Sequence, residues 1–198
     1  MAQSGKRHNQ NNPLLRGVSG KIGNVVIRQT AHGIVLANAP RKSSRKPNQQ
    51  EMAIRNRFSD AAEYARRQLQ YHTTKEMYQA KVNPKLNSAY VVAVKDFLSP
   101  PKILNLDITR YHGKIGNPII VDAEDDFRVN LVRITIKDAS GKTIERGQAS
   151  RRISYSDQWI YIASVKNDLL PGSSITARAE DLPGNQATAT ATIPESLH

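Results

Sequence analysis

The chain has 198 residues, a net charge of +12 and no cysteine. Its length suits one or two domains, and the missing cysteines exclude disulfides, thiolate zinc sites and cysteine nucleophiles. The charge lies in one half, because residues 1–99 hold 17 Lys and Arg against 5 Asp and Glu, whereas residues 100–198 hold 12 of each kind. A basic half joined to a neutral half favours one part that docks on an anionic surface and one that does not.

The first predicted segment, residues 1–46, is a basic glycine-rich arm with a β-hairpin and a linker. Two apolar clusters, residues 25–27 and 34–36, flank a turn that contains Gly33, which is a hairpin pattern. Residues 1–50 contain nine Lys and Arg and no acid. We expect these cations to contact a partner or phosphate groups: Lys6, Arg7, Arg16, Lys21, Arg28, Arg41, Lys42, Arg45 and Lys46.

The second predicted segment, residues 47–99, is helical. Apolar residues recur at three- and four-residue spacing from Ile54 to Leu69, as on one face of an amphipathic helix. Thr73 and Glu76 have the spacing of a capping box and predict the start of a second helix. A third helix is predicted from Leu86 to Phe97, and the double proline 100–101 after it marks a domain boundary.

The third predicted segment, residues 102–194, is all strand and turn. Seven short strands within about a hundred residues are typical of an immunoglobulin-like sandwich, and the missing cysteines exclude its disulfide-containing form. The predicted fold is therefore α+β: a basic arm, a β-hairpin and helices, followed by an all-β immunoglobulin-like sandwich. The predicted strands are residues 103–109, 118–124, 129–137, 143–150, 158–164, 174–180 and 186–193.

The string GKIGN occurs twice, at residues 20–24 and 113–117. Neither copy has the spacing of a phosphate loop, and the residues around the two copies differ. Residues 20–23 have the Gly-X-X-Gly pattern of a KH-type clamp. The polar residues before them contain too few apolar side chains to form the part of a KH fold that precedes the clamp. We expect the two copies to share turn chemistry, because glycine and asparagine both tolerate the backbone angles of turns. The alternative is a duplicated module.

The sequence contains no pattern that favours catalysis or a cofactor. The five histidines are scattered, and no nucleophile elbow is present. Two acidic clusters, in the turns before the third and the seventh predicted strand, would meet at one end of an immunoglobulin-like sandwich. Their oxygen ligands could hold Ca²⁺: Asp125, Asp126, Asp181 and Asn185. The sequence favours the alternative, a solvated acidic rim without metal.

Three tyrosines recur seven residues apart among cations: Tyr64, Tyr71 and Tyr78. Such residues can stack on nucleic-acid bases. Packing against a neighbouring helix or a partner protein is the interpretation that we favour for them.

Two resemblances add to these patterns. Residues 17–58 resemble short basic proteins predicted in bacterial and phage genomes, through SGKIGNVV at 19–26, the Pro47-Asn48 step, and Arg55 to Phe58. Some proteins of that kind are phage-structural, and the resemblance implies no catalytic residue. Residues 102–194 are similar to bacterial and phage immunoglobulin-like modules, through KDASGKTIERGQAS, QWIYIAS and AEDLPGNQATA. Such modules usually bind other molecules or decorate a larger assembly.

The favoured function is therefore structural and non-enzymatic. The basic segment would anchor on a large assembly of many copies, a phage or phage-like virion, and the sandwich would be displayed or contact neighbours. The alternative is a nucleoid- or ribosome-associated protein that binds nucleic acid through the same cations. A third hypothesis, an adhesion or carbohydrate-binding module, depends on the sandwich alone. No signal peptide or membrane segment is expected, and the predicted location is a virion or the cytoplasm.

Overall fold

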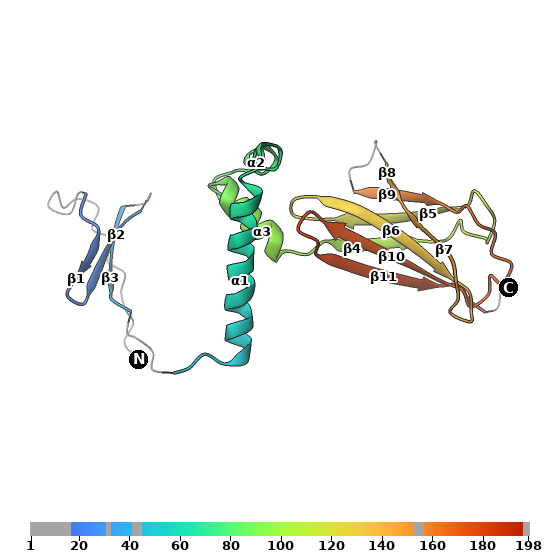
Figure 1. Cartoon of the computed structure of the whole chain (residues 1–198), viewed down its shortest axis with the longest axis horizontal. Helices are drawn as coiled ribbons and strands as arrows, with labels where there is room; N and C mark the ends of the chain where they lie inside the picture. The colour runs from blue at the N-terminus through green and yellow to red at the C-terminus, as the bar shows by residue number, and fades with distance from the viewer. Residues whose placement is uncertain (1–16, 31–32, 41–44, 153–156, 196–198) are drawn as a thin grey trace. The chain divides into compact units, whose positions relative to one another are not determined.

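The computed structural model describes residues 17–30, 33–40, 45–152 and 157–195 (Figure 1). The chain divides into two compact units, residues 1–48 and 49–198. Five of the nine predicted docking cations, Lys6, Arg7, Arg16, Arg41 and Lys42, lie outside the described residues. In the described part of the chain, no helix is both long and apolar enough to cross a membrane.

The first unit contains a three-stranded antiparallel sheet in the order β1-β2-β3. The strands are β1 (Gly20–Ile22), β2 (Val25–Thr30) and β3 (Gly33–Asn38). The predicted hairpin is the β2–β3 pair, in which Ile27 lies opposite Leu36. Strand β1 differs from the prediction, which interprets its residues Gly-Lys-Ile as part of a turn.

The second unit begins with three helices: α1 (Gln49–Gln68), α2 (His72–Gln79) and α3 (Ala89–Leu98). All three predicted helices are therefore present. Ser88 caps α3 by accepting a hydrogen bond from the Val91 amide at 3.3 Å. This bond satisfies one of the amides that the first turn of a helix leaves without a partner.

The predicted capping box at Thr73 is wrong. Helix α2 starts at His72, and its N-cap residue is Tyr71, whose side chain makes no capping hydrogen bond. The Thr74 hydroxyl instead donates to the backbone carbonyls of Gln68 and Tyr71 in the preceding turn. A threonine therefore does fix the connection between α1 and α2, but from inside the second helix.

The remaining strands form two four-stranded antiparallel sheets. One has the order β4-β5-β9-β8, with β4 (Lys102–Asp107), β5 (Pro118–Glu124), β9 (Gln158–Ile162) and β8 (Ser150–Arg151). The other has the order β11-β10-β6-β7, with β11 (Gln186–Thr192), β10 (Ser174–Asp181), β6 (Val129–Lys137) and β7 (Thr143–Gln148). All seven predicted strands are therefore present.

The core of this β-region draws buried side chains from both sheets, among them Val121 and Trp159 from one and Ile134 and Ala177 from the other. The alternating burial along β6 and β10 is what one buried sheet face requires. The predicted strand at 143–150 divides between the sheets. Ala149 is the residue at the crossing: it is buried, and its amide donates to the Val132 carbonyl at 2.8 Å.

The two GKIGN strings share the conformation of their second glycine. Gly23 and Gly116 both have positive φ, at 61° and 87°, and each Gly-Asn pair directly precedes a strand. The predicted shared turn chemistry is confirmed for these glycines. The first copy differs from the second because its residues 20–22 form β1.

A second core joins the helices to the β-region. It contains Tyr64, Tyr78 and Val92 from the helices together with Phe127 from the β5–β6 loop, and Leu182 packs against it. The rings of Tyr78 and Phe127 are stacked with centroids 4.4 Å apart. The double proline at 100–101 that the sequence marks as a boundary therefore lies inside the second unit.

Candidate functional site

Four predicted docking cations lie within the described residues: Lys21, Arg28, Arg45 and Lys46. All four are exposed. Strand register places Lys21 and Arg28 on the same face of the small sheet, because Lys21 lies opposite Val26 and side chains two residues apart share a face. The sheet therefore presents a cationic face.

The opposite face of this sheet is apolar. Register places Ile22 opposite Val25, and Ile27 opposite Leu36, all on one side. Among the described residues of this unit, only Ile27 and Ile34 are buried, whereas Ile22 is 63% exposed. Few described side chains of this unit are therefore buried, and part of the apolar face is open to a partner.

Helix α1 carries a second exposed apolar surface. The predicted apolar stripe is buried at Ala61, Ala62 and Ala65, but Ile54 and Phe58 are 70% and 56% exposed. These two side chains lie one helical turn apart on one face. The first half of α1 therefore presents an apolar stripe to solvent.

A buried acidic cluster lies where the helices meet the β-region. We call Asp96, Asp125 and Asp181 the acidic junction. Asp96 is on α3, Asp125 is in the β5–β6 loop and Asp181 ends β10. One carboxylate oxygen of each lies within 4.8 Å of the others, and Asp96 and Asp181 are both 1% exposed.

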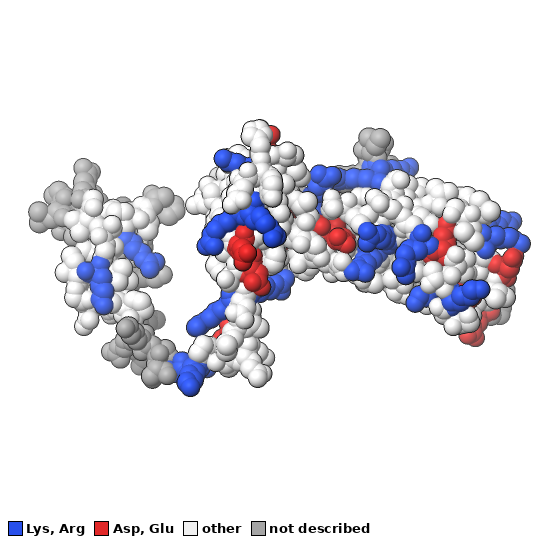
Figure 2. Space-filling model, viewed as in Figure 1, with Lys and Arg blue, Asp and Glu red and all other residues white. Residues whose placement is uncertain are grey.

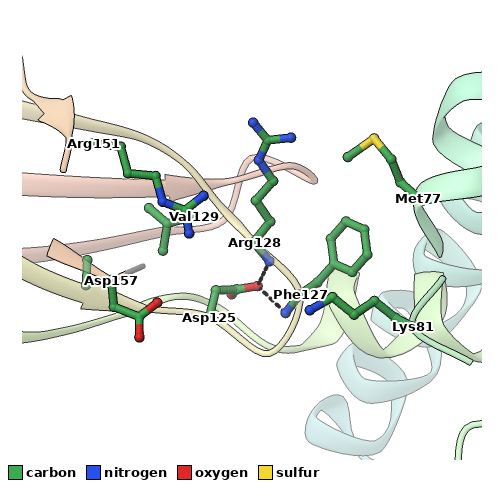
Figure 3. Close-up of a pocket in the computed structure, with 9 residues that line it drawn as sticks. Met77, Lys81, Asp125, Phe127, Arg128, Val129, Arg151 and Asp157 are labelled. Atoms are coloured by element: carbon green, nitrogen blue, oxygen red, sulfur yellow. Dashed lines mark hydrogen bonds between the residues drawn. The ribbon is translucent and has the colours of Figure 1, made fainter. Parts of the chain in front are cut away.

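Hydrogen bonds hold each carboxylate of the acidic junction in place. The Tyr78 hydroxyl donates to Asp96 Oδ2 at 2.6 Å. The Phe127 and Arg128 amides donate to Asp125 Oδ1 at 2.7 and 2.8 Å, as Figure 3 shows. Asp181 Oδ1 is held in the same way by two backbone amides of the β10–β11 turn, which donate at 2.8 and 2.6 Å.

Burial is the main reason why two carboxylates of this cluster have raised pKa values. It raises the pKa of Asp96 to about 7, against the effect of the Tyr78 hydrogen bond and together with repulsion from the other carboxylates. Burial likewise raises the pKa of Asp181. Carboxylates in such a place resist ionisation because the charged form is poorly solvated.

The sequence favours a solvated acidic rim and offers Ca²⁺ binding as the other interpretation, and the four residues named for Ca²⁺ take different positions. Asp125 and Asp181 meet as predicted. Asp126 instead forms an ion pair with Lys95 at 3.1 Å. Asn185 lies beside the acidic junction, where its side-chain amide donates to Asp181 Oδ2 at 2.7 Å.

Asp96 is the member of the cluster that sequence patterns do not predict, because it belongs to a helix that is remote in the chain. One signal is present. Asp96 lies three and four residues after Ala93 and Val92, which are on the buried face of α3. An acid on that face needs either a buried partner or a functional role.

The three spaced tyrosines do not form a base-stacking surface. Tyr64 and Tyr78 are buried, and their hydroxyl oxygens are 2.8 Å apart. Tyr71 is exposed. The favoured prediction, that these tyrosines pack in the protein, is confirmed for Tyr64 and Tyr78.

A cationic groove crosses the outer face of the β11-β10-β6-β7 sheet, although this half of the chain has no net charge. Figure 2 shows Lys and Arg side chains gathered along the sandwich. Part of this charge is balanced, since Arg133 lies 4.0 Å from Glu180. The groove is lined by Arg133, Thr135, Lys137, Arg146, Thr176, Arg178 and Thr188.

Comparison with known proteins assigns the chain to no family. No family model and no curated protein matches it. About half of the chain is similar to CopC from Methylosinus trichosporium OB3b, with 13% identity, 99% of that chain covered and a TM-score of 0.35. A tandem repeat from a large adhesion protein shows 19% identity over 49% of this chain and 24% of its own, with a TM-score of 0.31. A lipoprotein from Bacteroides thetaiotaomicron shows 12% identity over 50% of this chain and 82% of its own, with a TM-score of 0.26.

Proposed function

We propose that this chain is a non-enzymatic structural protein that docks through its N-terminal unit on a large assembly. The favoured assembly is a phage or phage-like virion. The observation that carries the proposal is the small sheet of the first unit, whose described residues include two buried side chains, an exposed apolar face and a cationic face. In this proposal, the surface on which the sheet lies stabilises it by covering the exposed apolar face.

The exposed stripe on α1 supports the same proposal. Ile54 and Phe58 follow the basic segment closely in the chain. Apolar side chains bordered by cations are typical of docking surfaces, where burial supplies affinity and charge supplies orientation. In this proposal the assembly covers both the small sheet and the stripe.

We infer that the sandwich is of the immunoglobulin type. Its sheet orders, β4-β5-β9-β8 and β11-β10-β6-β7, correspond to the A-B-E-D and G-F-C-C′ arrangement of that fold. Such a sandwich presents loops at both ends and suits display or contact with neighbouring subunits. The fold by itself does not specify a ligand.

The test uses phage or phage-like particles that are assembled in the presence of the full-length chain. A variant with Lys21→Gln, Arg28→Gln, Arg45→Gln and Lys46→Gln should sediment with particles much less than the unmodified chain does. The matched control carries Lys75→Gln, Lys85→Gln, Lys114→Gln and Lys142→Gln, which removes equal charge from exposed positions elsewhere. Equal loss in both variants, or no association of the unmodified chain, would contradict the proposal.

Nucleic-acid binding is the second candidate function. The cationic groove on the sandwich favours it, because Arg and Lys beside threonine hydroxyls can contact several phosphates. A filter-binding titration with duplex and single-stranded DNA distinguishes the candidates. Affinity that falls steeply with salt, with a slope of about −0.9 for each phosphate contacted on duplex DNA, would favour nucleic acid over protein docking.

A further inference from the structure

Two buried oxygen atoms of the acidic junction have no hydrogen-bond partner among the described residues. They are Asp96 Oδ1 and Asp125 Oδ2. Each belongs to a carboxylate whose other oxygen is already held, by the Tyr78 hydroxyl or by backbone amides. The unpartnered oxygens therefore belong to side chains whose orientation is fixed.

Unpartnered buried carboxylate oxygens are unfavourable because they lose the hydration that they would have in water. Three carboxylates that converge within 4.8 Å add mutual repulsion. A positive ion placed among them would remove both penalties.

Two neighbouring cationic side chains are directed elsewhere. Lys95 pairs with Asp126 at 3.1 Å, outside the acidic junction. The Arg128 side chain extends away from the Asp125 carboxylate, although its amide donates to that group (Figure 3). Neither Lys95 nor Arg128 therefore places its charge inside the acidic junction, and two further cations, Lys81 and Arg151, line the cleft beside Asp125 (Figure 3).

We propose that Asp96, Asp125 and Asp181 bind Ca²⁺. Carboxylate oxygens are hard ligands, and Ca²⁺ takes six to eight oxygens in flexible geometry, so water molecules would complete the shell. The three ligands come from α3, the β5–β6 loop and β10. The ion would therefore fasten the helices to the β-region, independently of any docking by the first unit.

One of the three proposed ligands, Asp125, lies at the wall of two clefts that open to solvent. Asp125 lines the cleft drawn in Figure 3, together with Met77, Phe127 and Arg128. It also lines a second cleft, beside Pro100. An entry path is one of the features that a metal site requires.

The test measures Ca²⁺ binding and thermal unfolding of the full-length, chelator-treated chain at neutral pH. We expect saturable binding of a single ion in calorimetry and, at millimolar Ca²⁺, a rise in the unfolding midpoint of about 5 °C or more. Terbium luminescence excited through tyrosine gives an independent readout, because Tyr78 contacts Asp96 directly. Added Ca²⁺ should quench that signal by displacing Tb³⁺.

Asp96→Asn should weaken Ca²⁺ binding by about tenfold or more, since it removes a charged ligand while keeping an acceptor for Tyr78. Asp125→Asn should weaken Ca²⁺ binding in the same way. Because Asp125 lies in a loop and is less buried than Asp96, this variant tests the proposal if Asp96→Asn does not fold. Asp126→Asn and the exposed Asp168→Asn are matched controls that should retain binding. Absent binding, equal binding in all variants, or an equal response to Mg²⁺ would overturn the proposal.

Discussion

The Asn185 side-chain amide donates a 3.0 Å hydrogen bond to the Phe97 carbonyl, which is 88 residues away in the chain. Asn185 lies in the β10–β11 turn, and Phe97 is in the last turn of α3. The same amide group also donates to Asp181 Oδ2. One side chain therefore connects the end of a helix, a sandwich turn and the acidic junction.

Asn185→Ala should lower the free energy of unfolding by about 1–2 kcal/mol, because it leaves the Phe97 carbonyl and Asp181 without this donor. Hydrogen exchange of the α3 amides should become faster. Asn105→Ala is the control, since Asn105 forms an exposed hydrogen bond to Asp122. Unchanged exchange in α3 would show that other contacts carry the connection.

Tyr78→Phe should destabilise the second unit by about 1–3 kcal/mol, because the buried Asp96 loses its hydroxyl donor. Urea unfolding, followed by the fluorescence of the single tryptophan, Trp159, measures this change. Tyr71→Phe alters an exposed ring and should have little effect. Equal stability of both variants would mean that the Tyr78 hydroxyl adds nothing to the core.

Glu145 should make stability depend on pH in the acid range. Burial acts to raise its pKa, but hydrogen bonds from Ser164, Tyr161 and Val165 prevail and hold the pKa below its ordinary value. A lowered native pKa stabilises the fold above the unfolded value and loses this contribution as pH falls through the native value. The unmodified chain should therefore lose stability below about pH 4.5 more steeply than Glu145→Gln does. Parallel curves of unfolding midpoint against pH would contradict this.

Gly113 and Gly116 form a matched pair in the second GKIGN string. Both have positive φ, but a Cβ on Gly113 would lie 2.6 Å from the Asn167 carbonyl oxygen, whereas one on Gly116 would meet nothing within 4 Å. Gly116→Ala should cost about 1–2 kcal/mol from backbone conformation alone. Gly113→Ala should lower the free energy of unfolding clearly more than Gly116→Ala does. Equal midpoints of thermal unfolding for the two variants would show that the loop at Asn167 moves to make room for the new Cβ.

Residues 49–198 should unfold like the full-length chain, since they form one compact unit. Residues 100–198 alone should still give a β-rich circular dichroism spectrum but a lower midpoint, because Phe127 loses its contact with Tyr78. Burial of one such aromatic side chain is worth about 1.5–3 kcal/mol. Identical midpoints for the two fragments would mean that the helices do not support the sandwich.

Local patterns predict most of the secondary structure. The alternation in 129–137 and 174–180 identifies β6 and β10, since one buried sheet face imposes a period of two. Strand β1 escapes prediction because Gly20 and Gly23 resemble turn residues, and only pairing with β2 reveals a strand. The capping box at Thr73 fails because a side-chain spacing does not determine where the preceding turn ends.

The acidic junction shows the limit of such patterns. Asp125 and Asp181 can be brought together by a fold hypothesis, because sandwich loops at one end are neighbours. Asp96 cannot, because its position depends on how α3 packs against those loops. Sequence patterns place Asp126 in the cluster instead of Asp96, but Asp126 pairs with Lys95 outside the cluster.

The stacking of Phe127 on Tyr78 has a consequence for how this protein can exchange parts with others in evolution. A recombination event at the double proline would transfer the sandwich without the helices. The Phe127 ring would then be exposed, because it would lose its contact with Tyr78. A breakpoint near residue 48 would transfer an intact folding unit. Mosaic descendants should therefore inherit the helices together with the sandwich as one unit.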